Sequence, residues 1–155
     1  MAIGIRPAEG EDDLGFMLGL GSRLTEVIRT ASHTAAEVQA FQDEYSAANL
    51  RHPPVDALTV IAVGGTGERL GFLHALPGHD GITGEAVGYV ALIAVVEAAE
   101  GSGAAQALIG AAEEWGRERG YRTLSLDVFS SNERGRRFYE KSGFVAESIR
   151  MVKRL

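Results

Sequence analysis

The chain has 155 residues, of which 45% are hydrophobic, no cysteine, and a formal net charge of −6. This length predicts one domain, residues 1–155, with a hydrophobic core of its own. The lack of cysteine excludes disulfides, cysteine nucleophiles and cysteine-bound metals, and the acidic balance argues against a nucleic-acid partner.

Charge is distributed unevenly along the chain. Residues 1–115 carry 5 Lys and Arg against 16 Asp and Glu, whereas residues 116–155 carry 10 against 5. One interpretation is chance, and the other is a basic C-terminal part that meets a phosphorylated cofactor while the acidic remainder suits a cationic acceptor. The first residues, with the acidic Glu9-Gly-Glu-Asp-Asp13, do not predict an apolar signal segment, and the apolar run over residues 86–96 is too short to span a membrane. We therefore expect a cytoplasmic protein with no membrane partner.

The first third of the chain predicts one strand and then helices. A short alternating strand over residues 2–6 precedes a helix that Asp12 can cap. Thr34-Ala-Ala-Glu37 has the spacing of a capping box, which predicts the start of a longer helix. The helical spacing predicts a buried face made of Val38, Phe41, Tyr45 and Ala48. Aromatic residues at this spacing are typical of a core, so we assign them no chemistry.

The remainder alternates strands with helices. Apolar and alternating runs predict strands over residues 58–63, 69–76, 86–96 and 123–128, and one last strand over residues 144–155. Helices are predicted over residues 104–115 and from the cap Asn132 to about residue 142. This order predicts an α/β (α+β) fold with a mixed, twisted central sheet flanked by helices, in which the parallel neighbours have right-handed crossovers.

The junction between the 86–96 strand and the 104–115 helix is the candidate anion site. Gly101 and Gly103 let the backbone approach a ligand closely. The N–H groups in the first turn of a helix have no intrahelical partner, and the helix dipole favours negative charge there. We predict that a pyrophosphate binds to the backbone of Gly101, Ser102, Gly103, Ala104, Ala105 and Gln106.

With three motifs further along the chain, this junction resembles the GNAT acetyltransferases. The motifs are Leu124-Ser-Leu-Asp-Val128, Asn132 and Arg137-Phe-Tyr-Glu-Lys-Ser-Gly-Phe144. The acyl-CoA motif of the family, Gln/Arg-x-x-Gly-x-Gly/Ala, aligns with residues 100–105, where Gly103 and Ala105 match. Glu100 departs from the motif, and a carboxylate beside a pyrophosphate is unfavourable unless it turns into water.

The resemblance implies a GNAT N-acetyltransferase that transfers an acetyl group from acetyl-CoA to a primary amine of a small molecule or protein. Backbone groups near Ile93 and Val95 would hold the pantetheine arm and polarise the thioester carbonyl. Asn132 would hydrogen-bond the pantetheine, and Tyr139 would act as the general acid that protonates the leaving thiolate. The amine would attack directly, and no metal is expected.

Other readings stay open at this point. A non-catalytic acyl-CoA-binding or sensing module on the same fold is favoured by Glu100, whereas Tyr139 and Asn132 favour an enzyme, because a pure binder needs no proton donor. Asn132 can serve only as a helix cap, and Tyr139 only as a half-buried aromatic. Another kind of nucleotide-phosphate binder ranks lower because no Gly-x-x-x-x-Gly-Lys loop is present.

The acceptor and the general base are not identified by any motif. His74 lies on a predicted strand and could face an acceptor cleft. Glu85, Tyr89 and Glu97 flank the central strand and could relay a proton from the amine, but ordered water can do the same. The expected partners are the amine acceptor and, in a homodimer, a second copy of the chain.

Overall fold

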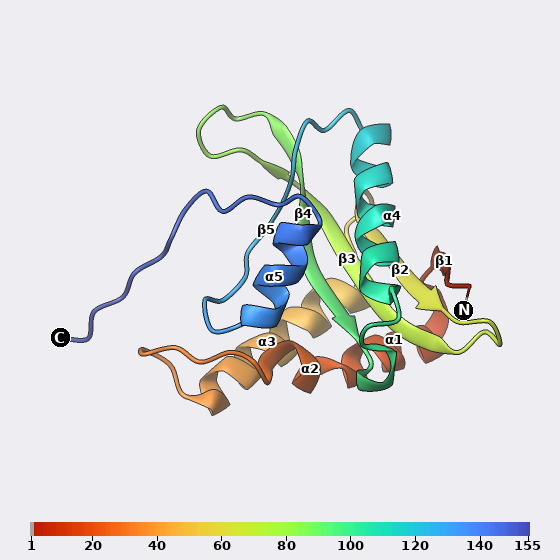
Figure 1. Cartoon of the computed structure of the whole chain (residues 1–155), viewed down its shortest axis with the longest axis horizontal. Coiled ribbons are helices and arrows are strands. Elements are labelled where there is room, and N and C mark those ends of the chain that lie inside the picture. The colour runs from red at the N-terminus through yellow and green to blue at the C-terminus, as the bar shows by residue number, and fades with distance from the viewer. Residues whose placement is uncertain (1) are drawn as a thin grey trace.

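The computed structural model describes residues 2–155, which form one five-stranded sheet with helices against it (Figure 1). The elements in chain order are β1 (Gly4–Pro7), α1 (Gly10–Gly19), α2 (Gly21–Thr25), α3 (Ala35–Arg51), β2 (Leu58–Val63), β3 (Arg69–His79), β4 (Ala86–Val95), the 3-10 helix η1 (Glu97–Ala99), α4 (Ala104–Glu118), β5 (Leu124–Leu126) and α5 (Glu133–Lys141). No helix within residues 2–155 combines the length and the apolar character needed to cross a membrane.

The sheet is mixed, as predicted. Its strand order is β1-β2-β3-β4-β5, with antiparallel pairing from β1 to β4 and a parallel pairing between β4 and β5. Each face carries its own apolar cluster, because successive side chains of a strand point to opposite faces. On β2, Val60 packs with α4 through Leu108, whereas its neighbour Ile61 packs on the other face with α1 through Met17.

β4 and β5 separate after a short paired stretch. Their parallel pairing covers three residue pairs and ends at Val90 opposite Leu126, although β4 continues to Val95. The register with β3 shifts at this point: Val90 pairs with Ala75 and Leu92 with His74, so Ala91 is an extra residue. Such a bulge bends a strand and increases its twist. The bulge therefore accounts for the end of the pairing between β4 and β5 at Val90.

Most predicted elements are confirmed, but their details differ. The capping box is present: Glu37 N–H donates to Thr34 Oγ1 at 3.1 Å, and Thr34 N–H donates to Glu37 Oε1 at 2.9 Å. The buried face predicted for this helix is wrong, because Phe41 is 65% exposed and the buried residues of α3 are Ser46 and Leu50. α3 packs mainly against α1 and α2, and Phe41 lies outside this contact.

The predicted last strand does not form. Residues 144–155 have no strand assignment and run as an extended tail (Figure 1), with Ile149 and Met151 exposed and with Arg154 Nη1 donating to the Ala31 carbonyl at 3.0 Å. A strand needs a partner ladder, and the edge of the sheet at β5 offers only three residues, Leu124–Leu126. The alternating pattern of the tail therefore has no edge of matching length to pair with.

Asp13 joins the start of α1 to the sheet. Its carboxylate, only 1% exposed as a residue, accepts hydrogen bonds from Arg6 Nη1 at 2.6 Å, Arg69 Nε at 2.7 Å and the Glu9 N–H at 2.8 Å. The contact with Glu9 makes Glu9, and not the predicted Asp12, the N-terminal boundary of the helix. The bond from Arg6 is the main cause that lowers the pKa of Asp13 far below its ordinary value.

Replacing Asp13 with asparagine should destabilise the fold by about 3 kcal/mol, because it leaves two guanidinium groups without their carboxylate. The estimate is at the lower end because both arginines are 35% exposed and can be hydrated again. Since the folded-state pKa is depressed, the stabilisation is present above the unfolded pKa of about 3.9 and is lost as the pH falls below it. Urea unfolding of both proteins between pH 7 and pH 3 should show the difference shrinking with acid. A constant difference would contradict the ionised pair.

Candidate active site

The loop between β4 and α4 is built on two glycines with left-handed backbone angles. Gly101 has φ 74° and Gly103 has φ 93°, and Gly103 directly precedes the first residue of α4. An L side chain in this region costs about 1–3 kcal/mol. An added Cβ at Gly101 would contact nothing within 4 Å, so the space outside the loop is open. The predicted glycine turn thus exists and exposes its backbone.

The N-terminus of α4 presents backbone donors at this turn. The Ala104 N–H donates to Ser102 Oγ at 3.2 Å and the Ser102 N–H donates to the Ala99 carbonyl at 3.1 Å, so two predicted phosphate donors already have partners. The N–H groups of Ala105 and Gln106 lie in the first turn, where a helix offers no acceptor. Gly103 O accepts the Ala107 N–H at 3.0 Å and starts the helical ladder. The turn can therefore bind an anion through the remaining donors.

Ile93 and Val95 have their backbone groups on the edge of β4 that faces away from β3 and is no longer paired with β5. The Ala94 carbonyl points at Gly71 of β3, and backbone groups of successive strand residues point to opposite edges. The carbonyls of Ile93 and Val95 therefore point away from β3. Arg23 Nε of α2 donates to the Val95 carbonyl at 3.2 Å from this side.

Asn132 caps α5 in the structure. Its Oδ1 accepts the Gly135 N–H at 2.9 Å, which satisfies one free donor of the first helical turn. A Cβ at Gly135 would lie 2.4 Å from Nδ2 of Asn132, so glycine leaves room for this side chain. The cap uses only Oδ1, and the amide nitrogen carries two further donors that can serve a ligand.

Tyr139 lines a groove of about 710 Å³ along β5, which also includes Tyr89, Ser125 and Asp127. Its ring packs edge-on against Phe138, with ring centroids 5.4 Å apart, and against Phe144 at 5.8 Å. Burial raises the pKa of Tyr139 above its ordinary value, so the phenol is protonated at neutral pH. The side chain therefore keeps a proton beside a groove that can admit a ligand.

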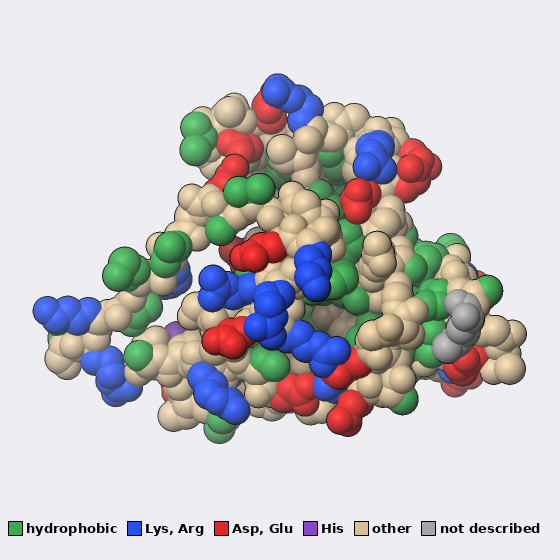
Figure 2. Space-filling view, viewed as in Figure 1, with side chains coloured by type: hydrophobic (Ala, Val, Ile, Leu, Met, Phe, Trp, Pro, Cys, Tyr) green, Lys and Arg blue, Asp and Glu red, His purple; other side chains and the backbone are tan. Residues whose placement is uncertain are grey.

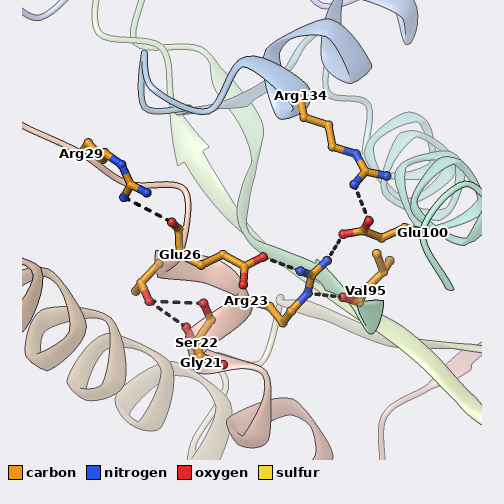
Figure 3. A network of polar contacts seen from close by, with 9 residues as sticks. Gly21, Ser22, Arg23, Glu26, Arg29, Val95, Glu100 and Arg134 are labelled. Atoms are coloured by element: carbon orange, nitrogen blue, oxygen red, sulfur yellow. Dashed lines mark hydrogen bonds and ion pairs between the residues drawn. The ribbon is translucent and has the colours of Figure 1, made fainter. Parts of the chain in front are cut away.

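Glu100, at the start of the glycine turn, lies between two arginines (Figure 3). Arg23 of α2 and Arg134 of α5 each form an ion pair with its carboxylate. The hydrogen bond from Arg134, followed by that from Arg23, lowers the pKa of Glu100. The carboxylate is therefore compensated by charges from elsewhere in the fold and does not turn into open water.

A sequence model of the Acetyltransferase (GNAT) family matches residues 19–144 of the chain. The chain belongs to the GNAT family of acetyltransferases. The uncharacterized N-acetyltransferase YdgE of Bacillus subtilis (strain 168) is 35% identical over 91 residues, which cover 57% of this chain and 55% of YdgE. The chain spans about half the length of the curated relatives that it matches.

Solved structures confirm the GNAT fold predicted from the motifs. The putative acetyl transferase from Pyrococcus furiosus matches with a TM-score of 0.78 at 24% identity, covering 99% of this chain and 100% of that one. The structure of AAC(6')-Iy in complex with the bisubstrate analog CoA-S-monomethyl-acetylneamine matches with a TM-score of 0.67 at 24% identity, and the match covers 100% of both chains.

The four side chains considered for proton transfer lie in different surroundings within this GNAT fold. His74 has no exposed surface, and burial lowers its pKa to about 4, so the possibility that it faces an acceptor cleft is not realised. Tyr89 donates to Asp127 Oδ2 at 2.7 Å, while Glu85 pairs with Arg122 at 3.0 Å. Glu97 starts η1, close enough to Arg23 to raise the pKa of that arginine.

Three polar residues of the site were not identified from the sequence: Arg23, Asp127 and Arg134. Asp127 directly follows β5, and the carboxyl end of a parallel strand is a common place for site residues. Arg134 lies in the first turn of α5, where the helix dipole disfavours a cation unless an anion is near. The sequence around Asp127 and around Arg134 therefore contained a cue to a functional residue, whereas the sequence of the short helix α2 contained no such cue for Arg23.

Proposed function

We propose that this GNAT protein is an N-acetyltransferase that transfers an acetyl group from acetyl-CoA to a primary amine by direct attack. The observation that carries the proposal is the end of the β4–β5 pairing at Val90, because it leaves one backbone edge of β4 unpaired by β5 as the chain runs to the glycine turn before α4. A long, thin ligand with a phosphorylated end fits this arrangement. The backbone of residues 101–106 would bind the phosphates, and Asn132 would donate its amide N–H groups to the pantetheine arm.

Acetyl-CoA supplies a thioester, and the residues of the chain orient it and handle one proton. A backbone N–H group on the edge of β4 that β5 leaves unpaired, near Ile93 and Val95, would polarise the reacting carbonyl. As the amine nitrogen bonds to the acetyl carbon and the carbon–sulfur bond breaks, Tyr139 would give its phenolic proton to the departing sulfur. The raised pKa of Tyr139 supports this role, since a general acid must be protonated before the reaction.

The groove along β5 suits a cationic amine as the acceptor. Its lining includes five carboxylates and one guanidinium: Asp80, Glu113, Asp127, Glu140, Glu147 and Arg136. An acidic groove raises the local concentration of a positively charged substrate. The Tyr89 phenol is a poor candidate for the base, because burial and its bond to Asp127 raise its pKa well above the ordinary range. We therefore infer that the amine loses its proton through water or a carboxylate of this groove.

The release of free thiol from acetyl-CoA across a panel of amines tests the proposal. The panel should include polyamines, aminoglycosides, amino acids and peptides with free N-termini or lysines, with a neutral amine of matched size as the control. We expect turnover with one or more cationic amines. Binding of acetyl-CoA without thiol release for any amine would instead support the non-catalytic acyl-CoA-binding module.

A further inference from the structure

Glu100 holds together three elements that are far apart in the sequence. Figure 3 shows its carboxylate between Arg23, which lies 77 residues before it, and Arg134, which lies 34 residues after it. Arg23 is also paired with Glu26 and donates to the Val95 carbonyl, so its charge is shared among several acceptors. Among the described residues, Arg134 has only Glu100 as an ion-pair partner.

Arg134 lies near the N-termini of two helices, and each of these N-termini carries the positive end of a helix dipole. It belongs to the first turn of α5, and its partner Glu100 directly precedes Gly101, at the entrance to the N-terminus of α4. Both helix ends favour negative charge. Figure 2 shows Lys and Arg side chains grouped over α5, which also carries Arg136, Arg137 and Lys141. A cation in this position is unfavourable by itself and becomes favourable when an anion joins it.

Arg134 can bind a second anion without leaving the first. Its side chain is 64% exposed, whereas that of Glu100 is 27% exposed. The bond to Glu100 uses Nη1, and a guanidinium has five N–H donors in a fixed plane, so the rest of its donors remain available. Arginine binds phosphate oxygens well, often through two parallel hydrogen bonds.

We propose that Arg134 is a ligand for the phosphate groups of the acyl-CoA at the Gly101–Gln106 turn, and that Glu100 is a positioning residue that orients Arg134 toward them. This inference rests on the proposed function. In this arrangement the Glu100 carboxylate holds the Arg134 guanidinium beside the phosphates, which offsets its own repulsion of them. α5 thereby supplies a positively charged side chain, which the turn itself lacks.

Calorimetric binding tests the ligand role with three proteins: wild type, Arg134→Gln and Arg117→Gln. Arg117 is the matched control because it is 68% exposed, lies near the far end of α4, and changes the net charge equally. We expect Arg134→Gln to weaken acetyl-CoA binding about 10-fold or more, the value of a charge-assisted hydrogen bond, and Arg117→Gln to change it less than about twofold.

S-acetyl-pantetheine, which has no phosphate, should bind to all three proteins with equal affinity. Equal losses for both ligands, equal losses in both variants, or unchanged binding in Arg134→Gln would overturn the ligand role. Failure of the wild type to bind acetyl-CoA would overturn the proposed function as well, so the two failures can be told apart.

A double-mutant cycle tests the positioning role of Glu100. In a Glu100→Gln background Arg134 is no longer held, and we expect the loss caused by Arg134→Gln to fall from about 10-fold to about threefold or less. The general effect of removing a negative charge near the phosphates cancels in this comparison. Equal losses in the two backgrounds would show that Glu100 does not orient Arg134.

Discussion

Replacing Tyr139 with phenylalanine should lower kcat by about 100-fold or more, while the affinity for acetyl-CoA changes little. The substitution keeps the ring that packs against Phe138 and Phe144 and removes only the hydroxyl. A thiol has a pKa of about 8.5, so expulsion of a bare thiolate is feasible but benefits from a shared proton. The fall in kcat should therefore reflect a slower chemical step.

The measurement compares kcat and acetyl-CoA binding in Tyr139→Phe with the same values in Tyr121→Phe. Tyr121 is a fair control because its ring packs edge-on against Trp115, with centroids 5.5 Å apart, and it is not among the residues that line the groove of Tyr139. Removing this second hydroxyl should leave kcat near the native value. A near-native kcat in Tyr139→Phe, with chemistry shown to be rate-limiting, would leave Tyr139 as a packing residue.

Replacing Gly103 with valine should weaken acetyl-CoA binding about 100-fold or more, since it removes several charge-assisted backbone contacts at once. An added Cβ at Gly103 would lie 3.9 Å from Ile3 Cδ1, and the bulk of valine directly before the first turn of α4 should keep the phosphates from approaching its donors. The left-handed φ of 93° adds backbone strain to the steric effect. Affinity and thermal stability must therefore be measured together.

Gly120→Val separates the two effects. Gly120 also has a left-handed φ, 75°, and an added Cβ would contact nothing within 4 Å, but it follows the far end of α4. Both variants should lose stability by about 1–3 kcal/mol, whereas only Gly103→Val should lose affinity. Unchanged acetyl-CoA affinity in a folded Gly103→Val protein would move the phosphates away from this turn.

Local sequence signals predicted the parts of the fold that depend on neighbouring residues. The capping box at Thr34, the cap at Asn132, the glycines at positions 101 and 103 and the strand over residues 58–63 were all located in this way. Such signals work because they are set by hydrogen bonds and backbone angles within a few residues. The motifs of the second half also identified the family, which the match over residues 19–144 confirms.

Contacts between distant segments decided what the sequence left open. The sequence shows Glu100 as an unpaired carboxylate, and only the approach of α2 and α5 turns it into the partner of Arg23 and Arg134. Burial of His74 depends on helices packed over both faces of the sheet, and the unpaired tail depends on the length of β5. The local pattern by itself thus determined the glycine turn and its helix, while the tertiary structure decided which charges surround them, because Coulomb interactions depend on distance in space and not on separation along the chain.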